Sequence, residues 1–193
     1  SVSALDSVIG SGGNDAVRMM GGGTLNVDLI DTVIGGTSTT DVVQLASTAS
    51  LSVSNVETVQ GTTDTTDAVR MLSAGTLATS AVDSVTGTSG NADILQLAGS
   101  DGAAVSVSAI ETVRGSAATD SVTLLASGGI AVSGVESVIG TSGADSLVYQ
   151  SGGTVSVSSI ETVTGTTGTG DVAAIMAAGA TTLSVSGIES VLG

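Results

Sequence analysis

The residues of this sequence that could do chemistry are acids, and they recur at a regular spacing. Fifteen of the 18 acids fall into two columns, and carboxylates are both the preferred ligands of hard cations and possible acid–base catalysts. The first column stands inside a recurring [IV]-[ED]-[ST]-V motif and comprises Asp6, Asp31, Glu57, Asp83, Glu111, Glu136, Glu161 and Glu189. The second column follows a Gly-rich turn and comprises Asp15, Asp41, Asp67, Asp93, Asp120, Asp145 and Asp171.

Composition excludes several classes of function. The 193-residue chain has no His, Cys or Lys, and so it lacks an imidazole base, a thiol nucleophile and a Schiff-base amine. A catalytic carboxylate pair should interrupt a repeat, whereas these acids are the repeat, and we therefore expect no enzyme activity. With three Arg and a net charge of −15 the chain cannot neutralise a phosphate track, which argues against a nucleic-acid partner. Membrane insertion is not expected either, because no apolar stretch approaches about 20 residues.

The organisation of the chain is a repeat with a period near 26 residues. Each unit ends its V-S-x-[IV]-[ED]-[ST]-V-x-G motif on a glycine, as in SVSNVETVQG and SVSAIETVRG. These closing glycines are Gly10, Gly35, Gly61, Gly87, Gly115, Gly140, Gly165 and Gly193. The aspartates of the second column recur with the same period, and two independent markers thus define one repeat.

Short strands are the elements that must position the acids. After each aspartate, apolar residues stand two apart, as in Val17/Met19 and Leu95/Leu97, a spacing typical of a strand. Such short segments cannot bury a face alone, so neighbouring units must stack and share a core. We predict an all-β fold, a parallel β-solenoid forming one array over residues 1–193, with no evident caps. If each unit makes one coil, about 7.5 coils of ~26 residues give a rod roughly 35 Å long.

Stacking of identical positions would give the acid columns an electrostatic cost. Carboxylates one strand spacing apart, about 4.8 Å, repel by about 3.5 kcal/mol per pair at an effective dielectric constant near 20. Three explanations remain open: a wet and tolerated column, carboxylates that accept N–H bonds in Gly-rich turns, or a bound cation. The turns before the second column are rich in oxygen ligands, which makes its seven aspartates, Asp15, Asp41, Asp67, Asp93, Asp120, Asp145 and Asp171, the candidate Ca²⁺ ligands.

At these turns the sequence resembles the RTX, or haemolysin-type, calcium-binding repeat proteins, whose nonapeptide is G-G-x-G-x-D-x-U-x. Residues 140–148 (GTSGADSLV) and 10–18 (GSGGNDAVR) each match it except at the second position. The other five turns are degraded, and one turn occurs per 26 residues instead of in tandem, so the ion site of the family cannot be carried over intact. The resemblance implies a secreted bacterial protein of the cell surface, of surface-layer or adhesin type, with calcium as its ion.

These observations favour a structural role: a building block of a surface layer, adhesin stalk or filament. The chain begins and ends in the same phase of the repeat, so we expect self-association, end to end or lateral, or a place within a longer solenoid. The alternative is an ice- or polysaccharide-binding module that uses an unbroken column of hydroxyls. This column comprises Ser7, Thr32, Thr58, Ser84, Thr112, Ser137, Thr162 and Ser190.

Overall fold

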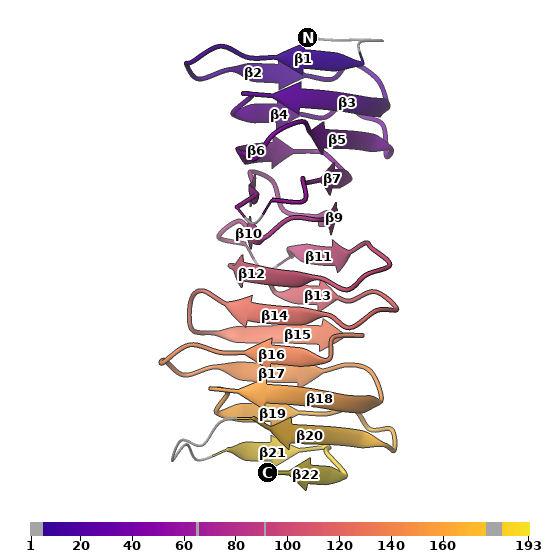
Figure 1. Ribbon diagram of the computed structural model, residues 1–193. Helices are drawn as coiled ribbons and strands as arrows, with labels where there is room; N and C mark the ends of the chain where they lie inside the picture. The colour runs from indigo at the N-terminus through magenta and orange to yellow at the C-terminus, as the bar shows by residue number, and fades with distance from the viewer. Residues whose placement is uncertain (1–5, 65, 91, 177–182) are drawn as a thin grey trace.

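The computed structural model describes residues 6–64, 66–90, 92–176 and 183–193, and in them the chain is an all-β solenoid. Two parallel sheets of 11 strands each face one another, and the chain alternates between them, so that odd-numbered strands form one sheet and even-numbered strands the other (Figure 1). No helix occurs in the described ranges, and accordingly none of their segments is a helix able to cross a membrane. The predicted fold class is confirmed.

The strands are short, between three and six residues each. The odd sheet contains β1 (Ser7–Ile9), β3 (Gly23–Asp28), β5 (Asp41–Leu45), β7 (Thr58–Gln60), β9 (Thr76–Ser80), β11 (Ile94–Leu97), β13 (Thr112–Arg114), β15 (Gly129–Ser133), β17 (Ser146–Tyr149), β19 (Thr162–Thr164) and β21 (Ser184–Ser186). The even sheet contains β2 (Ala16–Arg18), β4 (Thr32–Ile34), β6 (Ser50–Ser54), β8 (Ala68–Met71), β10 (Ser84–Thr86), β12 (Ala104–Ser108), β14 (Ser121–Leu124), β16 (Ser137–Ile139), β18 (Gly153–Ser158), β20 (Asp171–Ile175) and β22 (Ser190–Leu192).

The prediction that each 26-residue unit makes one coil is wrong. A 26-residue unit holds three strands, for example β4, β5 and β6, whereas a coil of two facing sheets closes after two strands. Each unit therefore makes one and a half coils, and 11 strands per sheet give about ten turns instead of 7.5. At about 4.8 Å per coil the rod is roughly 48 Å long.

A consequence of this mismatch is that identical positions do not stack on one another. In the odd sheet Val43 pairs with Val59, and Val59 pairs with Thr79, which are three different positions of the repeat. A given position returns to the same sheet only after two units, which is three coils or about 14 Å. Consecutive units thus present the same motif on opposite sides of the rod.

The core is a single aliphatic layer between the sheets. Inward residues alternate with outward ones along each strand, and Val33, Val43, Val59, Val85 and Val113 are fully buried. Tyr149, the one aromatic residue, also lies in this layer. A narrow layer one side chain deep from each sheet accommodates branched aliphatic residues, which accounts for a composition with 1% aromatics.

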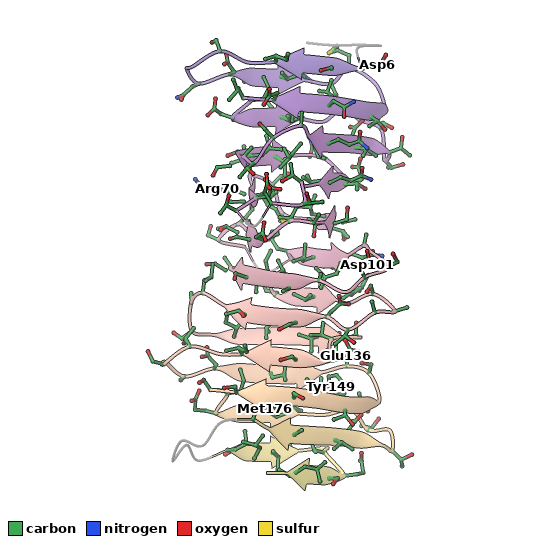
Figure 2. All side chains as sticks on the ribbon, viewed as in Figure 1. Asp6, Arg70, Asp101, Glu136, Tyr149 and Met176 are labelled. Carbon is green, nitrogen blue, oxygen red and sulfur yellow. The ribbon has the colours of Figure 1, made fainter. Side chains whose placement is uncertain are left out.

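The turns form two edges, which we name by the direction of the chain. Edge 1 holds the turns from an odd to an even strand, such as β1–β2 and β11–β12; edge 2 holds those from an even to an odd strand, such as β8–β9. The rod is twisted, as sheets usually are. Asp6, which precedes β1 on edge 2, lies on the right at the top of Figure 2, and Asp101, on edge 1, also lies on the right further down.

Candidate functional site

The seven aspartates proposed as calcium ligands lie at strand starts, immediately before or at the first residue of a strand. Asp15, Asp67, Asp120 and Asp171 are on edge 1, and Asp41, Asp93 and Asp145 are on edge 2. Six of the seven side chains are at most 2% exposed, and Asp15, nearest the N-terminus, is partly exposed. The predicted column at one strand spacing is therefore wrong, because neighbours on one edge are three coils apart. Their separation of about 14 Å exceeds the physiological screening length of about 8 Å, so repulsion between them is largely screened.

Asp67 illustrates how these carboxylates are held within their own turn. Its Oδ2 accepts the backbone N–H of Thr62 at 2.6 Å and the Thr62 hydroxyl at 2.8 Å. The Thr62 Oγ1 in turn accepts the backbone N–H of Asp64 at 3.2 Å. All seven aspartates receive the equivalent backbone N–H, from Ser11, Gly36, Thr62, Thr88, Ser116, Thr141 and Thr166. Charge-assisted bonds of this kind compensate the burial of a carboxylate.

The same aspartate also ties together the coils before and after it. The Oδ1 of Asp67 accepts the N–H of Ala49 from the preceding coil at 3.0 Å. The N–H of Asp67 donates to Oδ2 of Asp83 in the following coil at 2.8 Å, and its carbonyl accepts the N–H groups of Asp83 and Ser84. We call this arrangement the aspartate clamp. It joins three successive coils through the side chain and the backbone of one buried residue.

The clamp gives the first acid column its role. In each unit the motif acid accepts the N–H of the aspartate one coil earlier, at 2.7–2.9 Å. The acceptors are Asp31, Glu57, Asp83, Glu111, Glu136, Glu161 and Glu189. The two columns are therefore halves of one hydrogen-bonded network, in which the motif acids of the first column are less buried than the aspartates of the second.

The recurring glycine is required by a close approach between coils. The N–H of Gly61 donates to the carbonyl of Ser80 in the next coil at 2.8 Å. A methyl group on Gly61 would overlap the carbonyl oxygen of Ala81 and would stand 2.9 Å from Asp67 Oδ2. Gly35 makes the same approach to Asn55. Only a residue without a Cβ fits there.

The residue at the corner opposite this glycine has a backbone conformation in the left-handed region, with positive φ. Leu29, Asn55, Ala81, Ala109 and Ser159 have φ between 51° and 54°. Gly134 and Gly187 occupy the same corner in other units, with φ of 61° and 62°. These corners turn the chain in one residue and replace the longer turns found elsewhere, at a steric cost for each non-glycine residue.

Among the six buried aspartates, two clamps are incomplete. Oδ1 of Asp41 and Oδ1 of Asp171 are buried without a hydrogen-bond partner. In both cases the residue that pairs with the aspartate in the preceding coil is a glycine, Gly23 or Gly153, and its N–H donates instead to the carbonyl of Thr40 or Gly170. In these two clamps, the N–H group that elsewhere donates to Oδ1 of the aspartate therefore donates to the carbonyl of the residue before the aspartate.

The environment of the seven aspartates consists of N–H and hydroxyl donors, not of the six to eight oxygen ligands that Ca²⁺ prefers. No group of three or more acidic residues among the described residues is placed to hold a metal ion. This donor set does not fit a calcium shell, and among the six buried aspartates Oδ1 of Asp41 and Oδ1 of Asp171 accept no hydrogen bond. Calcium binding at the seven positions stays a prediction.

The hydroxyl column proposed for ice or polysaccharide is divided between the two sheets. Thr58, Thr112 and Thr162 start odd strands, while Thr32, Ser84 and Ser137 start even strands. Members on one face are three coils apart, so no unbroken hydroxyl array exists along this column. Arg18 and Arg70 occupy the same position of the repeat as Gln44 and Gln96, but the arginines lie on the even sheet and the glutamines on the odd sheet.

Sequence reasoning missed the hydroxyl that follows the glycine. Thr62, Thr88, Thr141 and Thr166 each bond to the clamp aspartate through Oγ1 at 2.7–2.8 Å. The signal was present in the sequence, since Thr or Ser stands directly after the glycine in six of the seven units.

The comparisons with known proteins add no relative. No protein-family model, no curated protein and no solved structure matches this chain.

Proposed function

We propose that this chain is a structural element of the bacterial exterior: a stiff, secreted rod within a surface layer, adhesin stalk or filament. The observation that carries the proposal is the aspartate clamp. The acids, the residue class best suited to chemistry in this sequence, are engaged in joining coil to coil along the whole rod. A repeat that devotes its polar side chains to its own axial cohesion suits a load-bearing or spacing role, and we assign it no catalytic function.

Self-association through the solenoid ends belongs to this proposal. The last coil leaves the inward residues Val185 and Val191 43% and 44% exposed, whereas Val163 and Val138 in earlier coils are fully buried. A further coil of the same geometry, from a continuation of the chain or from a second copy, would cover them and pair with β21 and β22.

Small-angle scattering and electron microscopy test the structural role. We expect an elongated particle about 48 Å long for a single rod, and multiples of that length where rods stack end to end. A compact, isometric particle would contradict the proposal. Monomeric rods at all concentrations would retain the spacer role and remove end-to-end stacking.

A thermal melt in millimolar Ca²⁺ and in excess chelator tests the calcium component. A ligand that binds only the folded state raises the melting temperature, and the rise grows with the ratio of ligand concentration to Kd. A large loss in chelator that is reduced in Asp41→Asn and Asp171→Asn would place the ions at the two incomplete clamps. An unchanged melt would leave hydrogen bonding as the whole role of the acids.

A further inference from the structure

We propose that edge 2 carries a lateral docking ridge whose partner is edge 1 of a second copy of this chain. The inference rests on the proposed structural role and names the partner and the surfaces through which rods would associate side by side.

The ridge is a row of large apolar side chains at one position of the turn. In every other unit, one large apolar side chain is exposed on edge 2 in the turn that follows β2, β8, β14 or β20. These side chains are Met20 (59%), Leu72 (47%), Leu125 (56%) and Met176 (69%). Successive members are 51–53 residues apart, which is three coils. The same position on edge 1 holds Ala46, Ala98 and Gln150. At this position of the turn, large apolar side chains therefore stand on edge 2 and not on edge 1, and a row of exposed apolar side chains is typical of an interaction surface.

Both edges carry acids of the repeat, such as Glu57 on edge 2 and Asp83 on edge 1, but the two edges differ in the charges that lie outside the acid columns. Arg18 and Arg70 are exposed on the even sheet two residues before Met20 and Leu72, at the margin of edge 2. The three acids that do not belong to the repeat, Asp28, Asp64 and Asp101, all lie on edge 1. Arg70 and Asp101 point to opposite sides of the rod in Figure 2. In a chain of net charge −15, these arginines are among the few groups that favour approach of a second copy.

Edge 1 offers hollows that suit the ridge. Where the corner at Ala81 turns tightly between two longer turns, it leaves a hollow of about 540 Å³. Its lining combines apolar residues such as Val82 and Ala104 with the three carboxylates of Asp64, Asp83 and Asp101. A second hollow, of about 340 Å³, lies at the Leu29 corner and includes Ile30 and Asp31. An apolar side chain accompanied by a guanidinium matches both lining chemistries.

The levels of ridge and hollow along the rod also match. Leu72 follows β8, and the Ala81 corner follows β9, so the two differ by half a coil, about 2.4 Å. Met20 and the Leu29 corner, which follow β2 and β3, have the same offset. Two parallel rods with almost no axial shift therefore bring each ridge residue opposite a corner. A second copy has the same three-coil period, because it has the same sequence and fold.

Such a contact joins different surfaces of the two copies, so it is open-ended and generates a row of rods. Because the edges wind around the axis, straight neighbours meet over part of their length. The level of Leu72 and the Ala81 hollow, with one arginine opposite three carboxylates, is the contact we expect to dominate.

The test is sedimentation velocity of the full chain over a concentration series at low and high salt. We expect concentration-dependent association that weakens as salt screens the charges. Arg70→Glu should weaken association about tenfold, as for truncated or reversed charges at an interface. Leu72→Ser should also weaken it. Arg114→Glu is the matched control: it makes the same change in net charge on an exposed arginine at the end of β13, beside the β13–β14 turn of edge 1, and since it adds no acid to edge 2 it should not weaken association.

A charge exchange makes the result specific. Asp101→Arg alone should weaken association, and its combination with Arg70→Glu should restore it. A wild-type chain that stays monomeric, equal effects of Arg70→Glu and Arg114→Glu, or a double variant no better than either single variant would each overturn the proposal. Scattering on the same samples reports the rod length separately, so failure of lateral docking is distinguishable from failure of the structural role.

Discussion

The clamps at Asp67 and Asp41 belong to consecutive units and share a glycine and a motif acid, yet their carboxylates accept different hydrogen bonds. In the first, both carboxylate oxygens accept hydrogen bonds, including the N–H of Ala49 from the preceding coil. In the second, Oδ1 is buried without a partner, because the N–H of Gly23 turns to Thr40. The difference shows that coil-to-coil cohesion depends on the residue that begins the neighbouring strand as well as on the aspartate.

The largest effect is expected from removing what the two clamps have in common. Gly61→Ala places a methyl group against the Ala81 carbonyl and near Asp67 Oδ2. Since backbone must move to accommodate it, we expect a loss of about 3 kcal/mol or more in the free energy of unfolding. Chemical denaturation measures it, with Gly12→Ala as control, because a Cβ on Gly12 meets no atom within 4 Å. Equal stability of the two variants would refute the close-approach explanation.

The second prediction separates the two clamps directly. Asp67→Asn places an amide NH₂ or a neutral oxygen against the N–H donors of Ala49 and Thr62, and should lower stability by about 2–3 kcal/mol. Asp41→Asn can direct its NH₂ to the oxygen position that has no donor, and should cost less than about 1 kcal/mol. Denaturation of both variants in parallel checks the ranking. A larger loss for Asp41→Asn would mean that the free oxygen has a partner of its own.

A smaller effect should come from the hydroxyl present in one turn and absent from the other. Thr62→Val removes the 2.8 Å bond to Asp67 Oδ2 and the acceptor for the Asp64 N–H, while retaining the shape of the side chain. We expect a loss of about 1 kcal/mol. Thr37→Val is the control in the Asp41 turn, since Gly36 occupies the position equivalent to Thr62. Hydrogen exchange at the Asp67 amide would report the local change, and unaltered protection would exclude a role for the hydroxyl.

The smallest effect is expected at the left-handed corners that face the glycines of the clamps. Ala81→Gly relieves a residue held at φ 51°, against the greater freedom of glycine in the unfolded chain. The balance should raise the free energy of unfolding by about 0.5–1 kcal/mol. Ala131→Gly, in strand β15, should instead lower it. A loss of stability in Ala81→Gly would indicate that the methyl group contributes packing at the corner.

Much of the local structure could be predicted from residue spacing. The two-residue alternation after each aspartate placed the strands, and the recurring glycine and aspartate identified the turns. What could not be predicted was the partner of each carboxylate. The bonds to Asp67 come from Thr62 nearby but also from Ala49 in the preceding coil, and its N–H reaches Asp83 16 residues later. Such partners depend on how the coil closes.

By itself the sequence determined a 26-residue repeat of short parallel strands, an aliphatic core, and a glycine and two acids at fixed places in every unit. Only the tertiary structure decided that a coil closes after two of the three strands in a unit. Periodicity specifies the spacing of elements, whereas closure depends on how many strands surround a core one layer thick. From that closure follow the alternation of the motif between two edges, the separation of equivalent aspartates on one edge by about 14 Å at about 4.8 Å per coil, and their burial among N–H donors.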